Sequence, residues 1–222
     1  MDTERVGAAW SGGDAGAVRD VTSEAELREL VGEPAPYTRD KTRTALHALD
    51  RAWLARSPFC LIATSGADGS CDVSPKGDPP GFALVLDDRT LAIPDRPGNK
   101  RLDGLRNVLA NPRVGLVFLI PGRGDMLRVN GRARIVREAP FFDRMTVRGN
   151  RPRLALVVEA EEIFHHCAKA ALRSDLWAPE TWRPDALPSR ARISKALERP
   201  DDALELLEEH YGPGYAEHLY EG

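Results

Sequence analysis

The chain has 222 residues, of which 42% are hydrophobic and 29% charged, so it can bury a core and global disorder is not expected. Its formal net charge of −3 argues against a protein that coats nucleic acid non-specifically. Three cysteines form an odd, sparse set, which predicts no disulfide framework and favours a reducing cytoplasm. The sequence has no apolar stretch long enough to cross a membrane, and its first residues lack the apolar segment of a secretory signal.

Two helices are expected before the first strand. Ser23 and Glu26 have the spacing of a capping box, which predicts a short helix that ends near Gly32. A second helix is expected over residues 42–56 and ends at Ser57-Pro58. Its buried stripe is predicted from three apolar side chains: Leu46, Leu49 and Trp53.

From residue 59 the pattern changes to short apolar runs separated by turns, which predicts an antiparallel sheet or barrel. Strands over residues 59–64 and 71–74 flank Asp68-Gly69, a dipeptide typical of hairpin turns. Cys60 and Cys71 lie in these runs and are expected in the core. Asn130-Gly131 predicts a bulge or bend. The further strands are expected over residues 82–86, 90–93, 114–120, 126–136 and 154–158.

The last third of the chain reads as mainly helical. Short helices are expected over residues 140–147 and 163–172, the latter continuing toward Trp177. A proline-rich irregular stretch covers residues 178–189, and two helical pieces follow at 193–198 and 201–210. We therefore divide the chain into an N-terminal extension over residues 1–40, a central domain over 41–177 and a C-terminal extension over 178–222.

One helix interrupts the strands. Leu102, Leu105, Val108 and Leu109 recur at the spacing of one helical face, and Asn111-Pro112 ends the helix. Before it lies a loop in which two prolines fix φ and Gly98 is expected to allow backbone conformations closed to other residues. The loop carries three cations and an amide: Arg96, Asn99, Lys100 and Arg101. A cationic loop that feeds a helix N-terminus suits a phosphate, while the alternative is a polar connection with solvated charges.

The order of these elements resembles the FMN-binding split barrel of the pyridoxamine 5'-phosphate oxidase class, over residues 59–136 and more weakly to 158. Four segments carry the resemblance: Val-Ser-Pro-Lys at 73–76, Asp-Arg-Thr-Leu at 88–91, Asn-Lys-Arg at 99–101 and Asn-Pro-Arg-Val at 111–114. Residues 93–99, 129–133 and 166–170 are similar to a bacterial subgroup of FMN-dependent members. The resemblance implies a mainly β fold, a split β-barrel with flanking helices, completed as a homodimer with each flavin between subunits.

By position, the resemblance also implies which residues contact the cofactor. Ten are implied: Ser74, Pro75 and Lys76 along the flavin, Ile93, Pro94 and Asp95 at its ring, and Arg96, Asn99, Lys100 and Arg101 at its phosphate. Two departures argue against pyridoxamine phosphate as the substrate. Met126 stands near the position where the family's oxidases have a glutamine, and the aromatic, arginine-rich ending of those oxidases is missing.

A second set of candidates lies nearer the C-terminus. Lys169, Arg173 and Trp177 are spaced at four, so on a helix they share one face. They suit an anionic substrate or the flavin of the other subunit, with the indole stacking on a ring; the alternative is a basic helix face that ends in a core tryptophan. Arg148, Arg151 and Arg153 form a solvated loop or, if they face the cleft, a second phosphate site.

His165, His166 and Cys167 invite comparison with a metal site. A structural zinc needs four ligands, and the sequence offers no second pair nearby, so no metal is expected. The family resemblance implies an FMN-dependent oxidoreductase that transfers two electrons to or from a small organic substrate. The alternatives are a reductase that uses the deazaflavin cofactor F420, and a non-catalytic carrier or sensor that binds flavin or haem.

Overall fold

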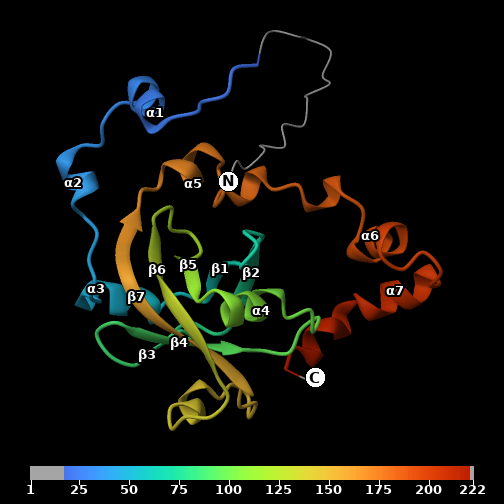
Figure 1. The fold of residues 1–222 in the computed structure, drawn as a ribbon. Coiled ribbons are helices and arrows are strands. Elements are labelled where there is room, and N and C mark those ends of the chain that lie inside the picture. Colours follow the sequence, from blue (N-terminus) through green and yellow to red (C-terminus); the bar gives the residue numbers. More distant parts are fainter. Residues whose placement is uncertain (1–17, 221–222) are drawn as a thin grey trace. The chain divides into compact units, whose positions relative to one another are not determined.

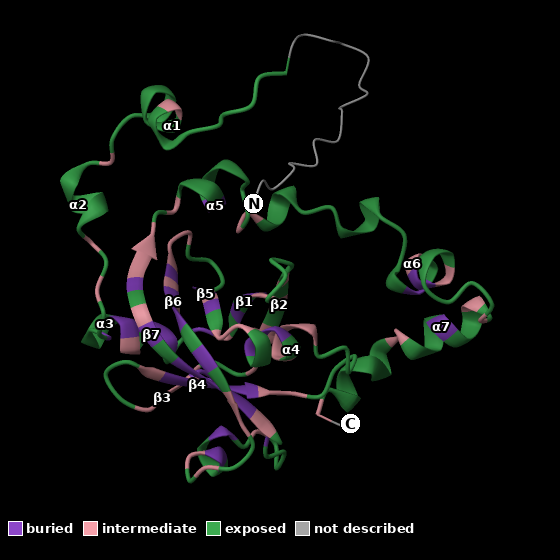
Figure 2. Ribbon diagram, in the orientation of Figure 1, coloured by how far each residue is buried: buried purple, intermediate pink, exposed green. Residues whose placement is uncertain are grey.

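The computed structural model describes residues 18–220 (Figure 1). The chain forms two compact units that meet between Lys41 and Thr42 in sequence. The first contains α1 (Glu24–Val31) and α2 (Pro36–Arg39). As predicted, Ser23 caps α1 by accepting a hydrogen bond from N of Glu26, and Gly32 ends the helix with a φ of 83°. No residue of either helix is buried (Figure 2), so local capping rather than core packing defines α1.

Seven strands in the described part of the second unit form one antiparallel sheet, as the sequence predicts (Figure 1). They are β1 (Phe59–Ser65), β2 (Cys71–Gly77), β3 (Leu84–Val85), β4 (Thr90–Asp95), β5 (Arg113–Leu119), β6 (Met126–Val136) and β7 (Leu154–His166). Their order in the sheet is β2-β1-β5-β6-β7-β4-β3. Several strand bounds differ from the prediction: β1, β2, β4 and β7 run further than expected, β5 is shifted by one residue, and β3 is shorter.

The β1–β2 hairpin sets which side chains share a face. Gly69 has a φ of 86° at the turn, as its place after Asp68 predicts. Thr64 lies opposite Asp72, and Ile62 opposite Ser74, so these four side chains project from the same side of the hairpin. The prediction for Cys60 is confirmed, since it is buried, but the prediction for Cys71 is wrong: it lies at the exposed start of the edge strand β2.

The predicted irregularity at Asn130-Gly131 is a β-bulge, because the register between β6 and β7 shifts between these two residues. The backbones approach closely there. A Cβ atom on Gly131 would lie 2.0 Å from the carbonyl oxygen of Glu159, so only glycine fits. The bulge lets the long strands bend, which a split barrel requires.

Two apolar cores lie on opposite sides of β4 and β7. Leu91, Ile93 and Val158 belong to the main core, which fills the barrel. Ala92 and Val157 belong to a second, smaller core, which the 3-10 helix η1 (Phe142–Met145) covers. Since successive strand residues point to opposite faces, this arrangement explains why β4 is buried along its whole centre while β1 alternates (Figure 2).

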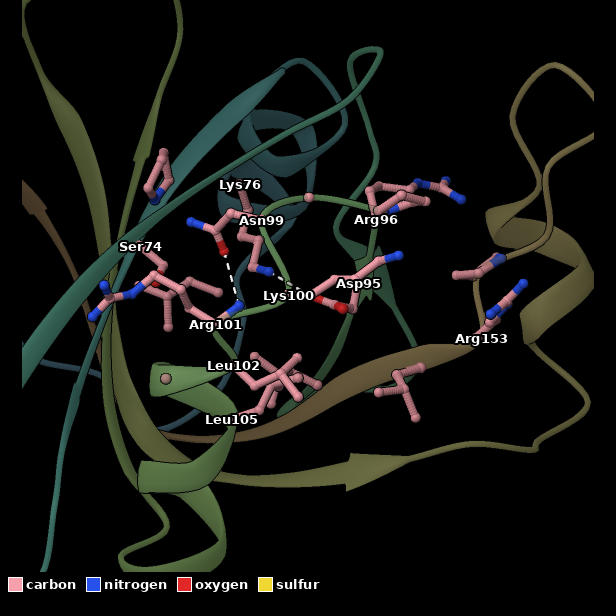
Figure 3. Close-up of a pocket in the computed structure, with 18 of the residues that line it drawn as sticks. Ser74, Lys76, Asp95, Arg96, Asn99, Lys100, Arg101, Leu102, Leu105 and Arg153 are labelled. Atoms are coloured by element: carbon pink, nitrogen blue, oxygen red, sulfur yellow. Dashed lines mark hydrogen bonds and ion pairs between the residues drawn. The ribbon is translucent and has the colours of Figure 1, made fainter. Parts of the chain in front are cut away.

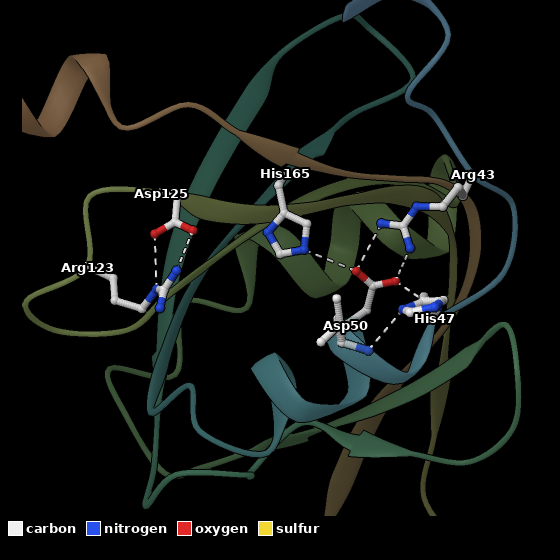
Figure 4. A network of polar contacts seen from close by, with 7 residues as sticks. Arg43, His47, Asp50, Arg123, Asp125 and His165 are labelled. Carbon is white, nitrogen blue, oxygen red and sulfur yellow. Dashed lines mark hydrogen bonds and ion pairs between the residues drawn. The ribbon is translucent and has the colours of Figure 1, made fainter. Parts of the chain in front are cut away.

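α3 (Ala48–Leu54) is shorter than the predicted helix, because Arg43 instead exchanges backbone hydrogen bonds with Ile163 of β7. Leu46 and Trp53 are buried as predicted, but Leu49 is 70% exposed. The buried polar residue of α3 is Asp50, whose carboxylate pairs with the Arg43 guanidinium and lies 3.1 Å from Nε2 of His165 (Figure 4). A buried, satisfied carboxylate therefore fixes α3 on the sheet.

The helix predicted over residues 163–172 is wrong at its start. β7 continues to His166, since Ile163 pairs with Val129 and His166 with Met126. The long partner strand β6 offers backbone groups that must be paired, and this outweighs the local helical pattern. Only α5 (Lys169–Arg173) is helical, so Trp177 lies beyond the helix and the three predicted residues do not share one helical face.

The C-terminal segment contains two helices, α6 (Arg190–Leu197) and α7 (Leu204–His210), with 3-10 turns before and after them. These turns are η2 (Pro179–Thr181), η3 (Pro184–Ala186) and η4 (Pro213–His218). α6 begins earlier than predicted because the Ser189 side chain accepts a hydrogen bond from N of Arg192 and caps it. α7 begins three residues later than predicted, and the proline-rich stretch before α6 is irregular apart from η2 and η3.

Candidate functional site

The loop that follows β4 has an unusual backbone. Lys100 has a φ of 59° and Leu102 a φ of 63°, both in the left-handed region that side chains other than glycine rarely adopt. Gly98 does not have a positive φ, and a Cβ atom there would meet nothing within 4 Å, so the role predicted for it is wrong. The loop takes its left-handed turns at Lys100 and Leu102 rather than at its glycine. Strained backbone of this kind is often found where ligands bind.

Leu102 is also the N-cap of α4 (Asp103–Ala110), and no side chain caps the helix. The first intrahelical hydrogen bond runs 2.8 Å from N of Arg106 to O of Leu102. The N–H groups of Asp103, Gly104 and Leu105 therefore have no intrahelical acceptor. Together with the helix dipole, these three groups give α4 an N-terminus suited to an anion.

Two asparagines anchor α4 to the β1–β2 hairpin. Nδ2 of Asn107 donates to Oγ1 of Thr64 at 3.1 Å and to Oδ2 of Asp72 at 2.7 Å. Asn111, the residue of the predicted Asn-Pro stop, donates from Nδ2 to Oγ of Ser65 at 2.8 Å. Val108 is buried as predicted, whereas Leu109 is exposed. These polar contacts fix the helix so that its N-terminus faces the inner side of the hairpin.

A cavity of about 660 Å³ lies where these elements meet. Its wall consists of the inner side chains of β1 and β2, the loop after β4, the first turn of α4, residues 149–154 and Tyr220. Figure 3 shows Ser74 and Lys76 on one side, Lys100 and Arg101 near the start of α4, and Arg153 on the other side. The volume is within the range of about 300–1,000 Å³ typical of ligand pockets.

The cavity is positively charged. Among the described residues that line it, six carry cationic side chains and three carry carboxylates. Two of the cations pair with carboxylates of the wall: Nζ of Lys76 lies 2.5 Å from Oδ1 of Asp95, and Nε of Arg101 lies 2.6 Å from Oδ2 of Asp103. Arg96 and Arg151 pair with carboxylates outside the wall, Asp78 and Asp143. The hydrogen bond to Asp103 raises the pKa of Arg101 above its ordinary value, so the guanidinium remains charged. An anionic ligand group is therefore favoured over a neutral or cationic one.

Arg96 is held by the protein itself. Its Nε donates to Oδ2 of Asp78 at 2.6 Å, and its other nitrogens donate to the carbonyls of Asn150 at 3.0 Å and Met145 at 2.6 Å. The Arg96 side chain is only 13% exposed and Asp78 only 1%. Of the four predicted phosphate ligands, Arg96 therefore uses its guanidinium to hold the loop against neighbouring segments of the protein.

The cavity brings together eight of the ten predicted cofactor contacts. Ile93 and Pro94 do not line it, because both are buried and Ile93 belongs to the main core. Lys169, Arg173 and Trp177 do not line it either: the first two are exposed, and Nε1 of Trp177 donates to the carbonyl of Arg123 at 2.7 Å. The eight that line it are Ser74, Pro75, Lys76, Asp95, Arg96, Asn99, Lys100 and Arg101.

The residues of the cavity wall that sequence reasoning missed include Thr64, Asp72 and Tyr220. Thr64 and Asp72 could have been found, since the Asp68-Gly69 turn fixes the hairpin register that places them opposite each other. Tyr220 could not, because no local pattern relates it to its hydrogen-bond partner Asp78, 142 positions earlier. Of the arginine group, Arg151 and Arg153 line the cavity, which favours the cleft alternative over a wholly solvated loop.

The site shows no arrangement that would hold a metal. Among residues 18–220, no three side chains of the His, Cys, Asp or Glu type come close enough together to ligate one. His165 and His166 occupy consecutive positions at the end of β7, so their side chains point to opposite faces of the sheet. The chemistry of the cavity is that of cations, backbone donors and apolar contacts.

Comparison with known proteins places the chain in a family. The model of the pyridoxamine 5'-phosphate oxidase family matches residues 46–167, which is more than half of the chain. The chain therefore belongs to this family, and its antiparallel sheet with flanking helices is the family's split barrel. No curated protein matches the sequence.

Three solved structures illustrate the likeness. HupZ of Group A Streptococcus is 20% identical, with a TM-score of 0.44 over 54% of this chain and 93% of that one. An FMN-binding protein of Syntrophomonas wolfei subsp. wolfei is 17% identical, with a TM-score of 0.41 over 54% and 89%. An F420 reductase is 20% identical, with a TM-score of 0.38 over 52% and 94%. In residues 18–220, we find no helix with the length and apolar character needed to span a bilayer.

Proposed function

We propose that the chain is an FMN-dependent oxidoreductase that holds its flavin in this cavity. The observation that carries the proposal is the uncapped N-terminus of α4, which lines a positively charged cavity together with Lys100 and Arg101. Free N–H groups, a helix dipole and cations are the donor set that a phosphate requires, and FMN ends in a phosphate. Membership of a family whose split barrel binds flavins supports the same cofactor.

Each part of the wall has a role in this proposal. Asn99, Lys100, Arg101 and the first turn of α4 bind the phosphate. β2 is an end strand of the described sheet, so backbone groups along its outer edge are available to the flavin at Ser74, Pro75 and Lys76. Asp95 fixes the Lys76 ammonium at 2.5 Å, which orients it toward the ring. Ile93 and Pro94 are buried in β4 just before Asp95, and they support the end of that strand.

The energy available at the phosphate is sufficient. Hydrogen bonds that involve charged groups contribute about 1.5–3 kcal/mol each, so three contacts contribute about 4.5–9 kcal/mol before association costs. Micromolar binding corresponds to about 8 kcal/mol, so no covalent link is needed. Bound FMN would supply the two-electron chemistry, and the chain would supply position and electrostatics for a small organic substrate.

We place a second copy of the chain against the outer face of the β1–β2 hairpin. Phe59, Leu61 and Val73 project from this face and are at least 37% exposed. An exposed apolar strand face of this kind is typical of an interface. Because Lys169 and Arg173 lie outside their own chain's cavity, we assign them, with Trp177, to the cavity or substrate of the second copy.

The test begins with the cofactor of the native protein. Release of the bound molecule and its mass should identify FMN; release of F420 or haem would instead identify one of the alternative functions. Reduction of the bound flavin by a nicotinamide or small-molecule donor then distinguishes an enzyme from a carrier or sensor, which would hold the flavin without turnover.

Charge reversal tests where the phosphate lies. The double variant Lys100→Glu, Arg101→Glu should weaken FMN about 100-fold or more, since two charge-assisted contacts become repulsive. Binding of riboflavin, which lacks the phosphate, should change much less. The matched control is Arg106→Glu, an exposed charge on the same helix that does not line the cavity. Equal FMN affinity in the double variant and the control would place the phosphate elsewhere.

A further inference from the structure

Tyr220 is the one residue beyond position 156 that lines the cavity, within the described part of the chain. It lies two residues after η4, where the C-terminal segment returns to the barrel beside the loop that follows β4 (Figure 1). Nothing in the family resemblance assigns a role to this position, because the resemblance ends before α6.

The contacts of Tyr220 are specific. Its hydroxyl donates to Oδ1 of Asp78 at 2.6 Å, and the Arg96 guanidinium lies 5.5 Å from the centre of its ring. Asp78 uses its other oxygen, Oδ2, to accept from Nε of Arg96 at 2.6 Å. Tyr220 therefore contacts both members of a nearly fully buried ion pair, through a hydrogen bond to one and a cation–π contact to the other.

This ion pair joins three segments of the chain that surround the cavity. Asp78 follows β2, Arg96 opens the cationic loop, and the Arg96 guanidinium donates to the carbonyls of Met145 and Asn150 in the β6–β7 connection. The segments joined in this way carry the predicted phosphate ligands on one side and Arg151 and Arg153 on the other. Burial and the hydrogen bond to Asp78 raise the pKa of Tyr220 above its ordinary value, so the phenol stays protonated and donates at neutral pH.

We propose that Tyr220 is a positioning residue of the cofactor site: it closes one wall of the cavity and, through Asp78 and Arg96, holds the loop over residues 96–101 in its binding conformation. The inference rests on the proposed function for the identity of the ligand, but the ordering of the loop is a property of the chain alone. The C-terminal segment, which contributes no strand to the barrel, thereby helps to position the cofactor loop.

The experiment uses full-length chains with single substitutions. Tyr220→Ala removes the ring and the hydroxyl, and Tyr220→Phe removes the hydroxyl alone. The matched control is Tyr215→Ala, which alters the neighbouring 3-10 turn η4 at a residue whose ring packs on His210 and Tyr211 rather than on the cavity. Hydrogen exchange of residues 96–101 is measured without ligand, and FMN affinity is measured by flavin fluorescence.

Tyr220→Ala should speed amide exchange in residues 96–101 and weaken FMN about tenfold, and Tyr220→Phe should fall between it and the native chain. Tyr215→Ala should change neither. Unchanged exchange in Tyr220→Ala, or an equal effect of Tyr215→Ala, would overturn the positioning role. If the native chain binds no FMN, the proposed function fails, and the exchange measurement still decides whether Tyr220 orders the loop.

Discussion

Nε2 of His165 lies 3.1 Å from Oδ1 of Asp50, although 115 positions separate the two residues. The Asp50 carboxylate also accepts hydrogen bonds from the Arg43 guanidinium, at 2.9 Å for Nη2, and from N of His47 at 2.8 Å (Figure 4). It is only 1% exposed. Three elements therefore meet at one buried carboxylate: the segment before α3, α3 itself and the end of β7.

Replacing Asp50 by Asn should destabilise the fold by about 3 kcal/mol, because it leaves a partly buried guanidinium without its counter-charge. Chemical denaturation measures the loss. The control is Asp88→Asn, which removes a carboxylate from an ion pair with Arg51 in which Asp88 is 85% exposed. That change should cost less than about 1 kcal/mol. Equal costs for the two variants would contradict a structural role for Asp50.

The same carboxylate gives stability a pH dependence. Burial alone would raise the pKa of Asp50, but the hydrogen bonds and charge of Arg43 outweigh it and hold the pKa below its ordinary value. A depressed folded-state pKa means that the contribution is complete above about pH 4 and is lost as pH falls through the lower folded value. Denaturation between pH 2 and 6 should therefore show an acid-side loss of stability that Asp50→Asn reduces.

The cysteines should react in two classes. Burial raises the pKa of the Cys60 thiol to about 12, whereas Cys71 and Cys167 are exposed. Because the thiolate is the reactive form, a thiol reagent should modify two cysteines of the native chain quickly and the third only after unfolding. Counting the released chromophore before and after denaturation gives the result. Fast modification of all three in the native chain would contradict the buried position of Cys60.

The backbone at Leu102 offers a test of the strained loop. Its φ of 63° costs a side-chain-bearing residue about 1–2 kcal/mol, and a β-branched residue more. Leu102→Gly should change stability by less than about 1 kcal/mol, since the relieved strain offsets the added freedom of the unfolded chain. Leu102→Val should destabilise by about 1–2 kcal/mol and weaken FMN. Loss of burial would give the opposite order, because glycine removes more of the half-exposed Leu102 side chain than valine does.

Much of the barrel was predictable because its signals are local. Apolar runs bounded by turn residues located the strands, Asp68-Gly69 located the first hairpin and Asn130-Gly131 located the bulge. The cationic loop was recognisable for the same reason, since its charges, the helix start and the Asn-Pro stop are contiguous in sequence.

The errors arise where distant residues decide the outcome. The helical pattern after Ile163 gives way to pairing with β6, because a strand as long as β6 leaves backbone groups that need a partner. Arg96 has the same charge as Lys100 and Arg101, but Asp78, Met145 and Asn150 engage it, and sequence alone does not reveal that these residues converge. Tyr220 likewise reaches the cavity only through the tertiary fold, which sequence alone does not reveal.

The bulge provides the sharpest test of the barrel geometry. Gly131 faces the backbone of β7 so closely that a Cβ atom would lie 2.0 Å from the carbonyl oxygen of Glu159, and backbone cannot move aside as a flexible side chain can. Gly131→Ala should therefore destabilise by at least about 2 kcal/mol. Gly98→Ala is the matched control, because a Cβ atom there meets nothing within 4 Å and its φ is not positive. It should be neutral or slightly stabilising. Similar unfolding midpoints for the two variants would mean that β6 and β7 do not approach each other in this way, and that the bend of the barrel has another origin.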